Sequence, residues 1–363
     1  MSSQLLYDLT LPEWARRLAE RGEPAYRARQ IFHNLYQRGI SDPERMTDLP
    51  QRLRQLLAKE FTALTLVPVQ RQEAADGTSK WLSKLQDGQL LETVLIPARS
   101  RRTVCVSTQV GCAYACAFCA SGMNGLRRNL TTGEIVQQVL LGSDPSKRGQ
   151  TPSPFRVTNV VFMGMGEPLA NYDNLLKAIR ILNAPEGLHL GARKITISTV
   201  GLVPMIERLA KEGLQIELSI SLHAPNDELR GRLMPVNRKY PLAQLIPAVK
   251  AYMKATKRLV TFEYILIDQV NDGLDQAKEL AKLLQGMLCK VNLIPCHPVP
   301  GLKGTVPEGD SPFARPPLPR MLAFERCLLA RKIPCTLRRS RGLDIDGACG
   351  QLRLHHEERI VVK

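Results

Sequence analysis

The spacing of hydrophobic positions changes along the 363-residue chain. Over residues 1–61 apolar side chains recur every three or four positions, which predicts amphipathic helices. From residue 62 to 98 apolar and polar side chains alternate, and two Asp-Gly pairs separate the alternating segments. This pattern predicts a small antiparallel sheet that joins the helices to the rest of the chain. Its expected strands are Leu64–Gln70, Ser79–Leu85 and Leu90–Ile96.

From about residue 104, short apolar strands alternate with helical segments six times. Such alternation implies parallel strands joined by right-handed crossovers. The predicted fold class is therefore α/β, either a partial (βα)6 barrel or a doubly wound sheet, with the reactive face at the carboxyl ends of the strands. The expected strands are Val104–Gln109, Asn159–Phe162, Lys194–Thr199, Gln215–Ser221, Leu259–Ile267 and Lys290–Ile294. The expected helices are Gly133–Leu141, Asn174–Leu182, Val203–Lys211, Leu242–Ala255, Asp275–Leu284 and Arg320–Arg331.

These patterns divide the chain into four parts. We expect a basic helical module (1–61), a short β extension (62–98), a barrel domain that includes a late cysteine loop (99–349) and a C-terminal tail (350–363). The proline-rich stretch Pro298–Pro319 follows the sixth strand, and a loop of this length is typical of a lid or a substrate-gripping arm.

The charge of the chain changes the expected partner. Lysine and arginine outnumber the acidic residues 50 to 34, which gives a net charge of +16 and a pI of about 9.6. Such a surface favours a polyanion, because neutralising phosphates releases counterions. A merely soluble basic protein is the alternative. Aromatic residues are only 5% of the chain, so the base-stacking surface of a single-strand-binding protein is not evident.

Several observations indicate a cytoplasmic protein. No run of eighteen apolar residues exists, so we expect no membrane span. The N-terminus lacks the basic and apolar regions of a secretory signal. The nine cysteines are odd in number, and three of them lie within eight residues, which is unlike a secreted disulfide framework.

The segment Gly111–Gly122 holds Cys112, Cys116 and Cys119 in the spacing C-x3-C-x2-C. Crowded thiolates are ligands for zinc or for iron–sulfur clusters. A structural zinc site closes four ligands, and a [4Fe–4S] cluster usually takes four cysteines. Three cysteines therefore predict a cluster with one open iron that can bind a substrate or cofactor. A zinc knuckle with a distant fourth ligand is the alternative.

Polar residues follow the other expected strands. Gly166 and Glu167 come after the second strand, where glycine lets the backbone approach a ligand and the carboxylate can accept from an amine; a plain turn is the alternative. Ser198 and Ser221 lie at the ends of later strands, and His223 and His297 follow later strands. Each alone is more often structural, but polar groups at one end of at least five strands indicate a common site.

Three residues outside the cysteine triplet are candidates for chemistry. Cys105 lies on the first barrel strand, and Cys349 lies in a loop whose glycines suit an exposed thiol, although packing is open for both. Glu92 is a carboxylate in an otherwise apolar strand, where burial disfavours the charged form and makes a proton acceptor. The cysteines expected only to pack are Cys289, Cys327 and Cys335.

Together these features resemble the radical S-adenosylmethionine enzymes, whose mark is a C-x3-C-x2-C loop after the first strand of a partial (βα)6 barrel. More narrowly, the chain resembles the RlmN/Cfr family of RNA adenosine methyltransferases over nearly its full length. Even the N-terminal helices resemble the small RNA-binding module of that family. The matching stretches are Tyr26–Ile31, Glu92–Pro97, Cys105–Cys112, Gly164–Leu169, Thr196–Thr199, Ser219–Asp227, Val291–Pro295 and Arg341–Leu352.

The resemblance implies the cofactors and their ligands. The three clustered cysteines would hold a [4Fe–4S] cluster whose open iron is chelated by S-adenosylmethionine. One departure concerns the end of the sixth strand, where the family has an aromatic residue and Asn and this chain has Cys296 and His297. The imidazole can still donate or accept a hydrogen bond. The residues implied to contact the cofactor are Gly166, Glu167, Ser198, Ser221, Leu222, His223 and His297.

The resemblance also implies a reaction with two molecules of S-adenosylmethionine per turnover. Cys349 would take a methyl group from the first. The second would be cleaved reductively to a 5′-deoxyadenosyl radical, which abstracts hydrogen from that methyl group, and the carbon radical would add to the adenine ring. Glu92 would accept a proton, and Cys105 would form a transient disulfide with Cys349 to free the product.

The implied activity is methylation of carbon 2 of adenosine in 23S rRNA, in the peptidyl transferase region, and in the anticodon loop of tRNA. A monomer that receives electrons from a donor such as flavodoxin or ferredoxin is implied as well. Methylation of carbon 8 of the ribosomal adenosine, or the same chemistry on another RNA, remains open. A non-catalytic, zinc-holding RNA-binding protein is the hypothesis of a different class, and it gives Cys105 and Cys349 no role.

Overall fold

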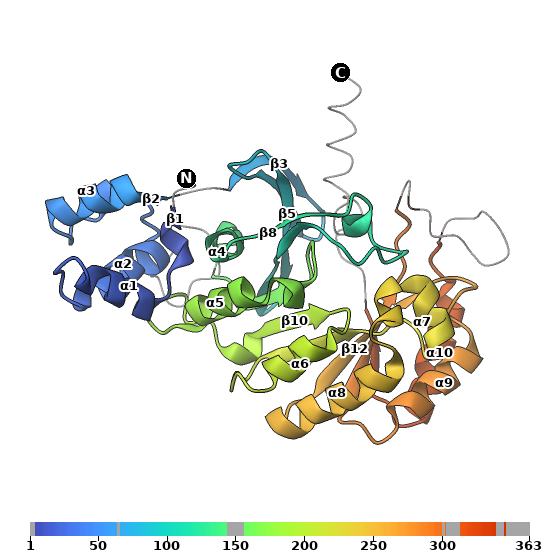
Figure 1. The fold of residues 1–363 in the computed structure, drawn as a ribbon. Helices are drawn as coiled ribbons and strands as arrows, with labels where there is room; N and C mark the ends of the chain where they lie inside the picture. Colours follow the sequence, from blue (N-terminus) through green and yellow to red (C-terminus); the bar gives the residue numbers. More distant parts are fainter. Residues whose placement is uncertain are drawn as a thin grey trace.

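The computed structural model describes residues 4–63, 66–143, 156–299, 302, 313–338 and 345. Over these residues a ten-stranded sheet runs in the order β14-β13-β12-β11-β10-β9-β6-β5-β4-β3 (Figure 1). In this sheet, β6 and the strands from β9 to β14 are parallel and follow one another in chain order. A doubly wound sheet would reverse its order at a switch point, so this sheet is the partial barrel. The parallel strands are β6 (Arg101–Cys105), β9 (Asn159–Phe162), β10 (Ile195–Thr199), β11 (Glu217–Ser221), β12 (Val260–Leu266), β13 (Cys289–Pro295) and β14 (Cys335–Leu337).

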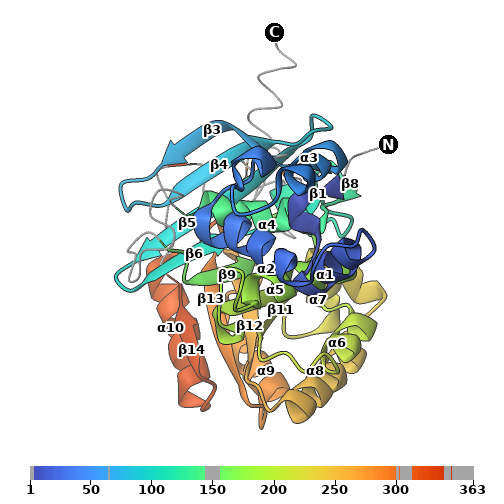
Figure 2. The ribbon, with the colours of Figure 1, turned by 90° about the vertical axis from the view of Figure 1, so that its left-hand side faces the viewer.

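Helices cover the outer side of these parallel strands (Figures 1 and 2). The six expected helices and the second to sixth expected strands are confirmed with ends within two residues. The elements that were not expected in the barrel sheet and its helical layer include α7 (Asp227–Leu233) and the three-residue strand β14. The remaining helices are α4 (Thr132–Leu141), α5 (Tyr172–Asn183), α6 (Val203–Leu209), α8 (Leu242–Thr256), α9 (Leu274–Leu284) and α10 (Leu318–Ala330).

The first barrel strand differs from the prediction. Val104–Gln109 was expected to be one strand, but β6 ends at Cys105. Gln109 begins a separate short strand, β7 (Gln109–Gly111), which pairs with β8 (Leu126–Asn129). The two short strands form the neck of the loop that carries the clustered cysteines, so the chain must leave the main sheet before that loop begins.

The antiparallel β extension continues the barrel sheet. Its strands are β3 (Val67–Glu73), β4 (Ser79–Lys84) and β5 (Leu90–Ala98). β5 pairs antiparallel with β6, so the extension is not a separate joining sheet. The first expected strand begins at Val67 rather than Leu64, which lies outside the described residues.

The sheet has two chemically different faces. Cross-strand neighbours point to the same face, and successive residues alternate. Ile197, Leu218 and Phe262 lie on the face that packs against the helices and are almost fully buried in the hydrophobic core. The residues between them are polar, with Ser198 opposite Ser219 and Ser219 opposite Thr261. We call this second side the pocket face.

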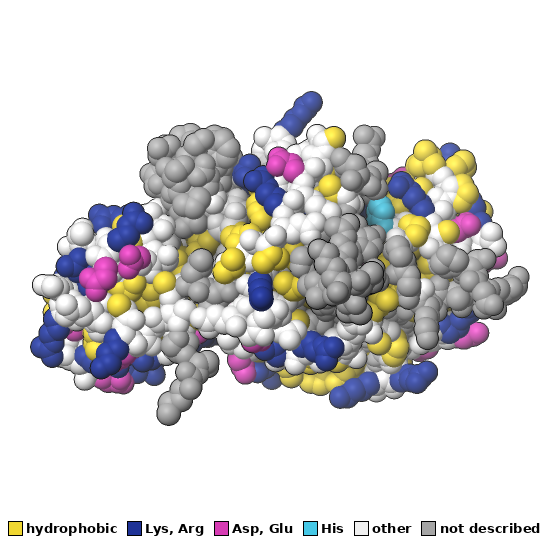
Figure 3. Space-filling view, turned by 90° about the horizontal axis from the view of Figure 1, so that it is seen from above, with side chains coloured by type: hydrophobic (Ala, Val, Ile, Leu, Met, Phe, Trp, Pro, Cys, Tyr) yellow, Lys and Arg dark blue, Asp and Glu magenta, His cyan; other side chains and the backbone are white. Residues whose placement is uncertain are grey.

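The N-terminal module packs its helices around buried aromatic and aliphatic side chains. Its helices are α1 (Leu11–Ala19), α2 (Tyr26–Phe32), which continues as a π-helix, and α3 (Gln51–Glu60). Asp8 joins the module to the barrel, because its Oδ1 accepts a 2.7 Å hydrogen bond from the backbone of Gly133 in the first turn of α4. On the face seen in Figure 3, Lys and Arg side chains lie along the edge of this lobe, at the left, together with acidic ones. The exposed arginines of the lobe are Arg16, Arg29, Arg38, Arg45 and Arg52.

In the described part of the chain, no helix combines the length and the apolar character that crossing a bilayer requires.

Candidate functional site

A cavity of about 250 Å³ opens at the carboxyl ends of the parallel strands. It combines residues from the cysteine loop, from the turn after β9 and from the pocket face of β10 to β13. Of the predicted site residues, eight line it: Cys112, Cys116, Cys119, Gly166, Glu167, Ser198, Ser221 and His223. Four do not: Glu92, Cys105, Leu222 and His297. Cys349 lies outside the described residues.

Backbone contacts fix the path of the cysteine loop. Gly111 has a φ of +79°, and a Cβ there would lie 1.9 Å from the carbonyl oxygen of Gly125, so only glycine fits this crossing. The backbone of Cys112 donates to that same carbonyl at 3.1 Å. Farther along, Ala117 donates to the carbonyl of Leu233 at the end of α7. The loop is therefore held at its neck and at its tip.

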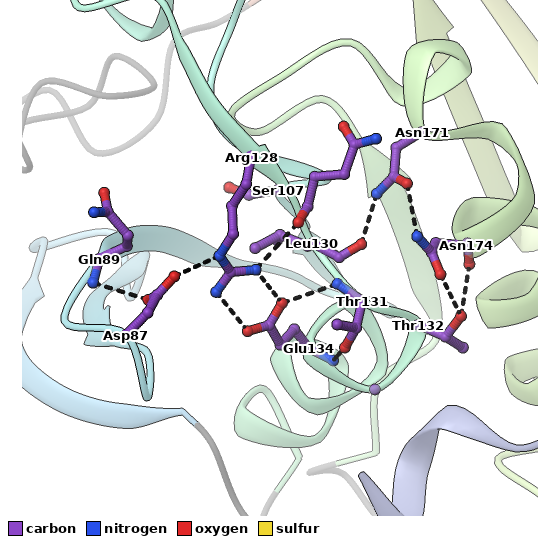
Figure 4. A network of polar contacts seen from close by, with 12 residues as sticks. Asp87, Gln89, Ser107, Arg128, Leu130, Thr131, Thr132, Glu134, Asn171 and Asn174 are labelled. Atoms are coloured by element: carbon purple, nitrogen blue, oxygen red, sulfur yellow. Dashed lines mark hydrogen bonds and ion pairs between the residues drawn. The ribbon is translucent and has the colours of Figure 1, made fainter. Parts of the chain in front are cut away.

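Arg128 on β8 anchors the strand that leaves the loop (Figure 4). Its guanidinium makes two 2.8 Å hydrogen bonds to the carboxylate of Glu134 and one to Asp87. These acidic partners raise the pKa of Arg128. Glu134 also accepts from the backbone of Thr131 in a capping box at the start of α4. One side chain thus connects the cysteine loop to both the β extension and the barrel.

Burial favours the protonated form of two of the loop thiols. Burial raises the pKa of Cys112 to about 12 and that of Cys116 well above its ordinary value. Metal binding to such thiols must displace their protons. Among the described residues no three His, Cys, Asp or Glu side chains converge on the position of a single ion. A cubane [4Fe–4S] cluster does not require such convergence on one ion, because each of its cysteines binds a separate iron. The three thiols line the same cavity as the carboxylate of Glu167.

The turn after β9 presents Gly166 and Glu167 to the cavity. Gly166 has a φ of +93°, and a Cβ there would lie 2.5 Å from the Cβ of Gln109. The carboxylate of Glu167 accepts hydrogen bonds from the backbone of Leu169 at 3.0 Å and of Val200 at 2.8 Å. Burial raises the pKa of Glu167 to about 7. A cationic amine of a ligand would pair with this carboxylate and favour its ionised form.

His223 lies in the cavity wall as a neutral imidazole. Its Nδ1 accepts a 3.0 Å hydrogen bond from the backbone of Ile265, and its ring packs edge-on against Phe118 of the cysteine loop. Burial lowers the pKa of His223 to about 3. Since Nδ1 is an acceptor, the proton of the neutral ring is on Nε2. The ring can therefore donate one hydrogen bond through Nε2.

Sequence reasoning missed three charged residues: Glu263 and Arg338 line the cavity, and Arg230 contacts the lining residues Val200 and Ser221. Glu263 on β12 lines the cavity, and burial raises its pKa. Arg230 on α7 is fully buried and donates to Asn237 Oδ1 at 2.7 Å and to the carbonyl of Val200 at 2.8 Å. The strand alternation could have assigned Glu263 to the pocket face, because it stands two residues after Thr261. Nothing in the seven-residue α7 indicates that Arg230 would be buried.

Glu92 and Cys105 also belong to the pocket face. Cys105 is opposite Val161 on β9, and Val161 is opposite Thr196, which has the same side-chain direction as Ser198. Glu92 is two residues before Val94, the partner of Cys105 on β5. Both predicted catalytic residues are buried, at 3% and 7% exposure. Glu92 is not an isolated carboxylate as the sequence suggested, because Lys80 forms a 2.8 Å ion pair with it.

Comparison with known proteins identifies the family. Residues 106–284 match the radical SAM superfamily, and residues 5–62 match the ribosomal RNA large subunit methyltransferase N-terminal domain. The chain is 47% identical over 348 residues to the probable dual-specificity RNA methyltransferase RlmN of Geobacillus kaustophilus, covering 96% of this chain and 92% of the relative. It belongs to the RlmN family of radical SAM methyltransferases.

Other relatives agree with this membership. The probable dual-specificity RNA methyltransferase RlmN of Symbiobacterium thermophilum is 48% identical, covering 97% of this chain and 92% of the relative. A crystal structure of a radical SAM methyltransferase from Sphaerobacter thermophilus superimposes with a TM-score of 0.88 at 51% identity, covering 96% of this chain and 98% of that one. The predicted family and fold are confirmed. As a radical SAM enzyme, the chain uses a [4Fe–4S] cluster and S-adenosylmethionine.

Proposed function

We propose that the protein methylates carbon 2 of adenosine in RNA, with 23S rRNA (peptidyl transferase region) and the tRNA anticodon loop as substrates. This proposal rests on one observation. The pocket face of the sheet is continuous from the cavity that the three cysteines line to the two buried residues Glu92 and Cys105. The relatives named as dual-specificity RNA methyltransferases support the substrate class.

The cavity residues bind and orient the cofactors. Cys112, Cys116 and Cys119 hold the cluster, and Glu167 holds the amine of S-adenosylmethionine. When bound, the cluster and two molecules of S-adenosylmethionine supply a methyl group and a 5′-deoxyadenosyl radical. His223 donates a hydrogen bond to S-adenosylmethionine through Nε2, because its Nδ1 already accepts one from the backbone. The further proposed cofactor contacts are Gly166, Ser198, Ser221, Leu222 and His297. Leu222 and His297 do not line the cavity, so the family resemblance alone supports their contacts.

The remaining catalytic residues handle the methyl carrier and the proton. Cys349 carries the methyl group that is joined to the adenine carbon. Glu92 accepts the proton of that carbon, and the bound cluster would take up the unpaired electron that the radical addition leaves in the ring. Cys105 then loses its thiol proton as its sulfur attacks the sulfur of Cys349, a disulfide forms, and the bond between the Cys349 sulfur and the methylene carbon breaks. The electron pair of the broken bond stays on carbon, which takes up a proton to become the methyl group of the product.

The proposal extends to the parts of the chain and its partners. The proposed division of the chain is a helical module (1–61), a β extension (62–98), a barrel domain (99–349) and a tail (350–363). The helical module would bind the RNA backbone through its exposed arginines. The positive charge of the chain supports this role for the module. We propose that the protein acts as a cytoplasmic monomer and receives electrons from a flavodoxin or ferredoxin.

Mass spectrometry of modified nucleosides tests the activity. The protein, reconstituted anaerobically with iron and sulfide, is incubated with RNA, S-adenosylmethionine and a reductant, and the RNA is digested to nucleosides. We expect 2-methyladenosine from both rRNA and tRNA. An 8-methyladenosine product would contradict the assignment of carbon 2, and cofactor cleavage without a methylated adenosine would contradict the substrate.

A further inference from the structure

Lys80 is a fully buried lysine on a strand that none of the cofactor contacts uses. Its side chain is 0% exposed, and its Nζ lies 2.8 Å from Oε2 of Glu92, which is 3% exposed. Burying two charges is strongly unfavourable unless they pair closely. An ammonium in such a place therefore needs a partner of the opposite charge, and Glu92 provides one.

The sheet register puts Lys80 in line with the catalytic residues. Lys80 is opposite Val94 on β5, and Val94 is opposite Cys105 on β6. All three side chains thus point to the pocket face, with Lys80 and Cys105 two strand spacings, or about 10 Å, apart. Glu92 stands two residues before Val94 and shares that face. The ion pair is therefore part of the surface that continues into the cavity.

Burial creates a problem for a carboxylate base. A base must be ionised before it can take a proton, but a carboxylate removed from water is stabilised in its neutral form. A neutral Glu92 would hold the very proton that it has to accept from the substrate. An ammonium group at hydrogen-bond distance opposes this preference, because it stabilises the ionised carboxylate.

We propose that Lys80 is a positioning residue that keeps Glu92 ionised and aimed at the pocket face until it accepts the proton of adenosine. In that step the C–H bond breaks, its electron pair stays in the adenine ring, and the proton forms an O–H bond on Glu92 while Lys80 keeps its own protons. This inference rests on the proposed function for its catalytic part. The ionisation of Glu92 is a property of the protein without RNA.

Infrared difference spectroscopy of the RNA-free protein tests the ionisation directly. Lys80→Met removes the ammonium and keeps an apolar stem of similar length, and Glu92 can neutralise by taking up a proton, so the fold should hold. At pH 7 we expect Lys80→Met to gain a protonated-carboxyl band relative to wild type, and Lys80→Met/Glu92→Gln to lack it. Absence of this band in folded Lys80→Met would overturn the proposal, whatever the activity on RNA.

The partial reactions test the catalytic part. Proton acceptors contribute about 100-fold or more, so Lys80→Met should form 2-methyladenosine at least about tenfold more slowly. It should still cleave S-adenosylmethionine at the wild-type rate and should accumulate RNA covalently bound to the protein. Lys80→Arg keeps the charge and should restore product formation to within about tenfold of wild type.

A matched control separates this role from a structural one. Lys84 lies on the same strand and the same face as Lys80 but is exposed, so Lys84→Met should leave both partial reactions unchanged. Equal slowing of cofactor cleavage and product formation in both Lys80 variants would contradict a positioning role. If wild type itself makes no methyladenosine, the proposed function fails, while the infrared result still decides the ionisation of Glu92.

Discussion

At the scale of single residues, the site depends on positions where the side chain, or its absence, is dictated by close neighbours. Gly111 and Gly166 leave room that a Cβ would fill, and both have backbone angles that favour glycine. His223 has its Nδ1 occupied by a backbone donor and its ring held by Phe118. The residue types at these positions follow from contacts rather than from their place in a motif.

Gly166→Ala should damage the cofactor turn. The new Cβ would lie 2.5 Å from the Cβ of Gln109 and 2.9 Å from its backbone nitrogen, so one of the two segments must shift. We expect S-adenosylmethionine binding to weaken by at least about tenfold and the free energy of unfolding to fall by about 1–3 kcal/mol more than in a control. Gly213→Ala is that control, because it has a similar positive φ and nothing within 4 Å. Equal effects of the two substitutions in calorimetry and denaturation would refute this account of Gly166.

His223 should make the fold sensitive to acid. Burial lowers its pKa to about 3 in the folded protein, against 6.5 for an ordinary histidine. The unfolded chain therefore binds a proton that the folded chain does not, so stability contributed by this group is complete above pH 6.5 and is lost as the pH falls toward 3. The slope reaches about 1.4 kcal/mol per pH unit.

His223→Gln removes this titration and should reduce the loss of stability between pH 7 and pH 5, measured by urea unfolding. His189→Gln, at an exposed position, should change the slope little. A slope in His223→Gln as steep as in wild type would show that the burial of this imidazole does not govern the acid sensitivity.

At the scale of elements, the strand and helix pattern predicted the fold better than it predicted the site. Alternation of apolar strands with helices was sufficient for the parallel sheet, because each crossover buries an apolar helix face. Short elements escaped prediction: α7 has seven residues and β14 has three, too few for a recognisable period. The ion pair between Lys80 and Glu92 was not predicted either, because it depends on the register between two strands, which composition does not specify.

Substitution of Arg230 tests how much the unexpected helix α7 contributes to the stability of the site. Its guanidinium is fully buried and donates to Asn237 and to the carbonyl of Val200, next to the site where Glu167 is held. Arg230→Met leaves these acceptors unpaired and should lower the free energy of unfolding by about 3 kcal/mol, with faster loss of iron to a chelator.

Arg232→Met provides the matched control, because Arg232 lies on the same helix and is exposed. Its unfolding free energy should stay within about 0.5 kcal/mol of wild type. Indistinguishable stabilities and iron-loss rates for the two variants would contradict the assigned role of Arg230.

At the scale of the whole molecule, the chain joins a sheet extension to a partial barrel by strand pairing, and it joins an N-terminal helical module to the barrel by side-chain contacts. Cofactor and catalytic residues were recognised from sequence through motifs, and the structure adds that the strand residues among them, Glu92, Cys105 and Ser198, share one face of a continuous sheet. That relationship could not be read from the sequence, since β5 and β6 were expected to belong to different sheets. Cys349 is the proposed methyl carrier and lies outside the described residues.

Asp8 tests the junction between module and barrel. Its carboxylate accepts from the backbone of Gly133 at 2.7 Å and from Leu5 at 3.0 Å. Asp8→Ala removes a negative partner from the first turn of α4 and should weaken the junction by about 1 kcal/mol. We expect hydrogen exchange in that turn to rise by about fivefold. Asp173→Ala, at an exposed surface ion pair, should leave exchange there unchanged, and a rise of the same size would argue against a specific role of Asp8.

The most direct test of the central claim compares two buried strand cysteines on opposite faces of the sheet. Cys105 lies on the pocket face, whereas Cys289 is opposite Val260 on the helix-packing face. In an anaerobic reaction with RNA, S-adenosylmethionine and a reductant, Cys105→Ala should accumulate RNA covalently joined to the protein and release no 2-methyladenosine. Cys289→Ala should release it at the wild-type level. Release of product by Cys105→Ala at the wild-type level would contradict the claim that the pocket face carries the chemistry.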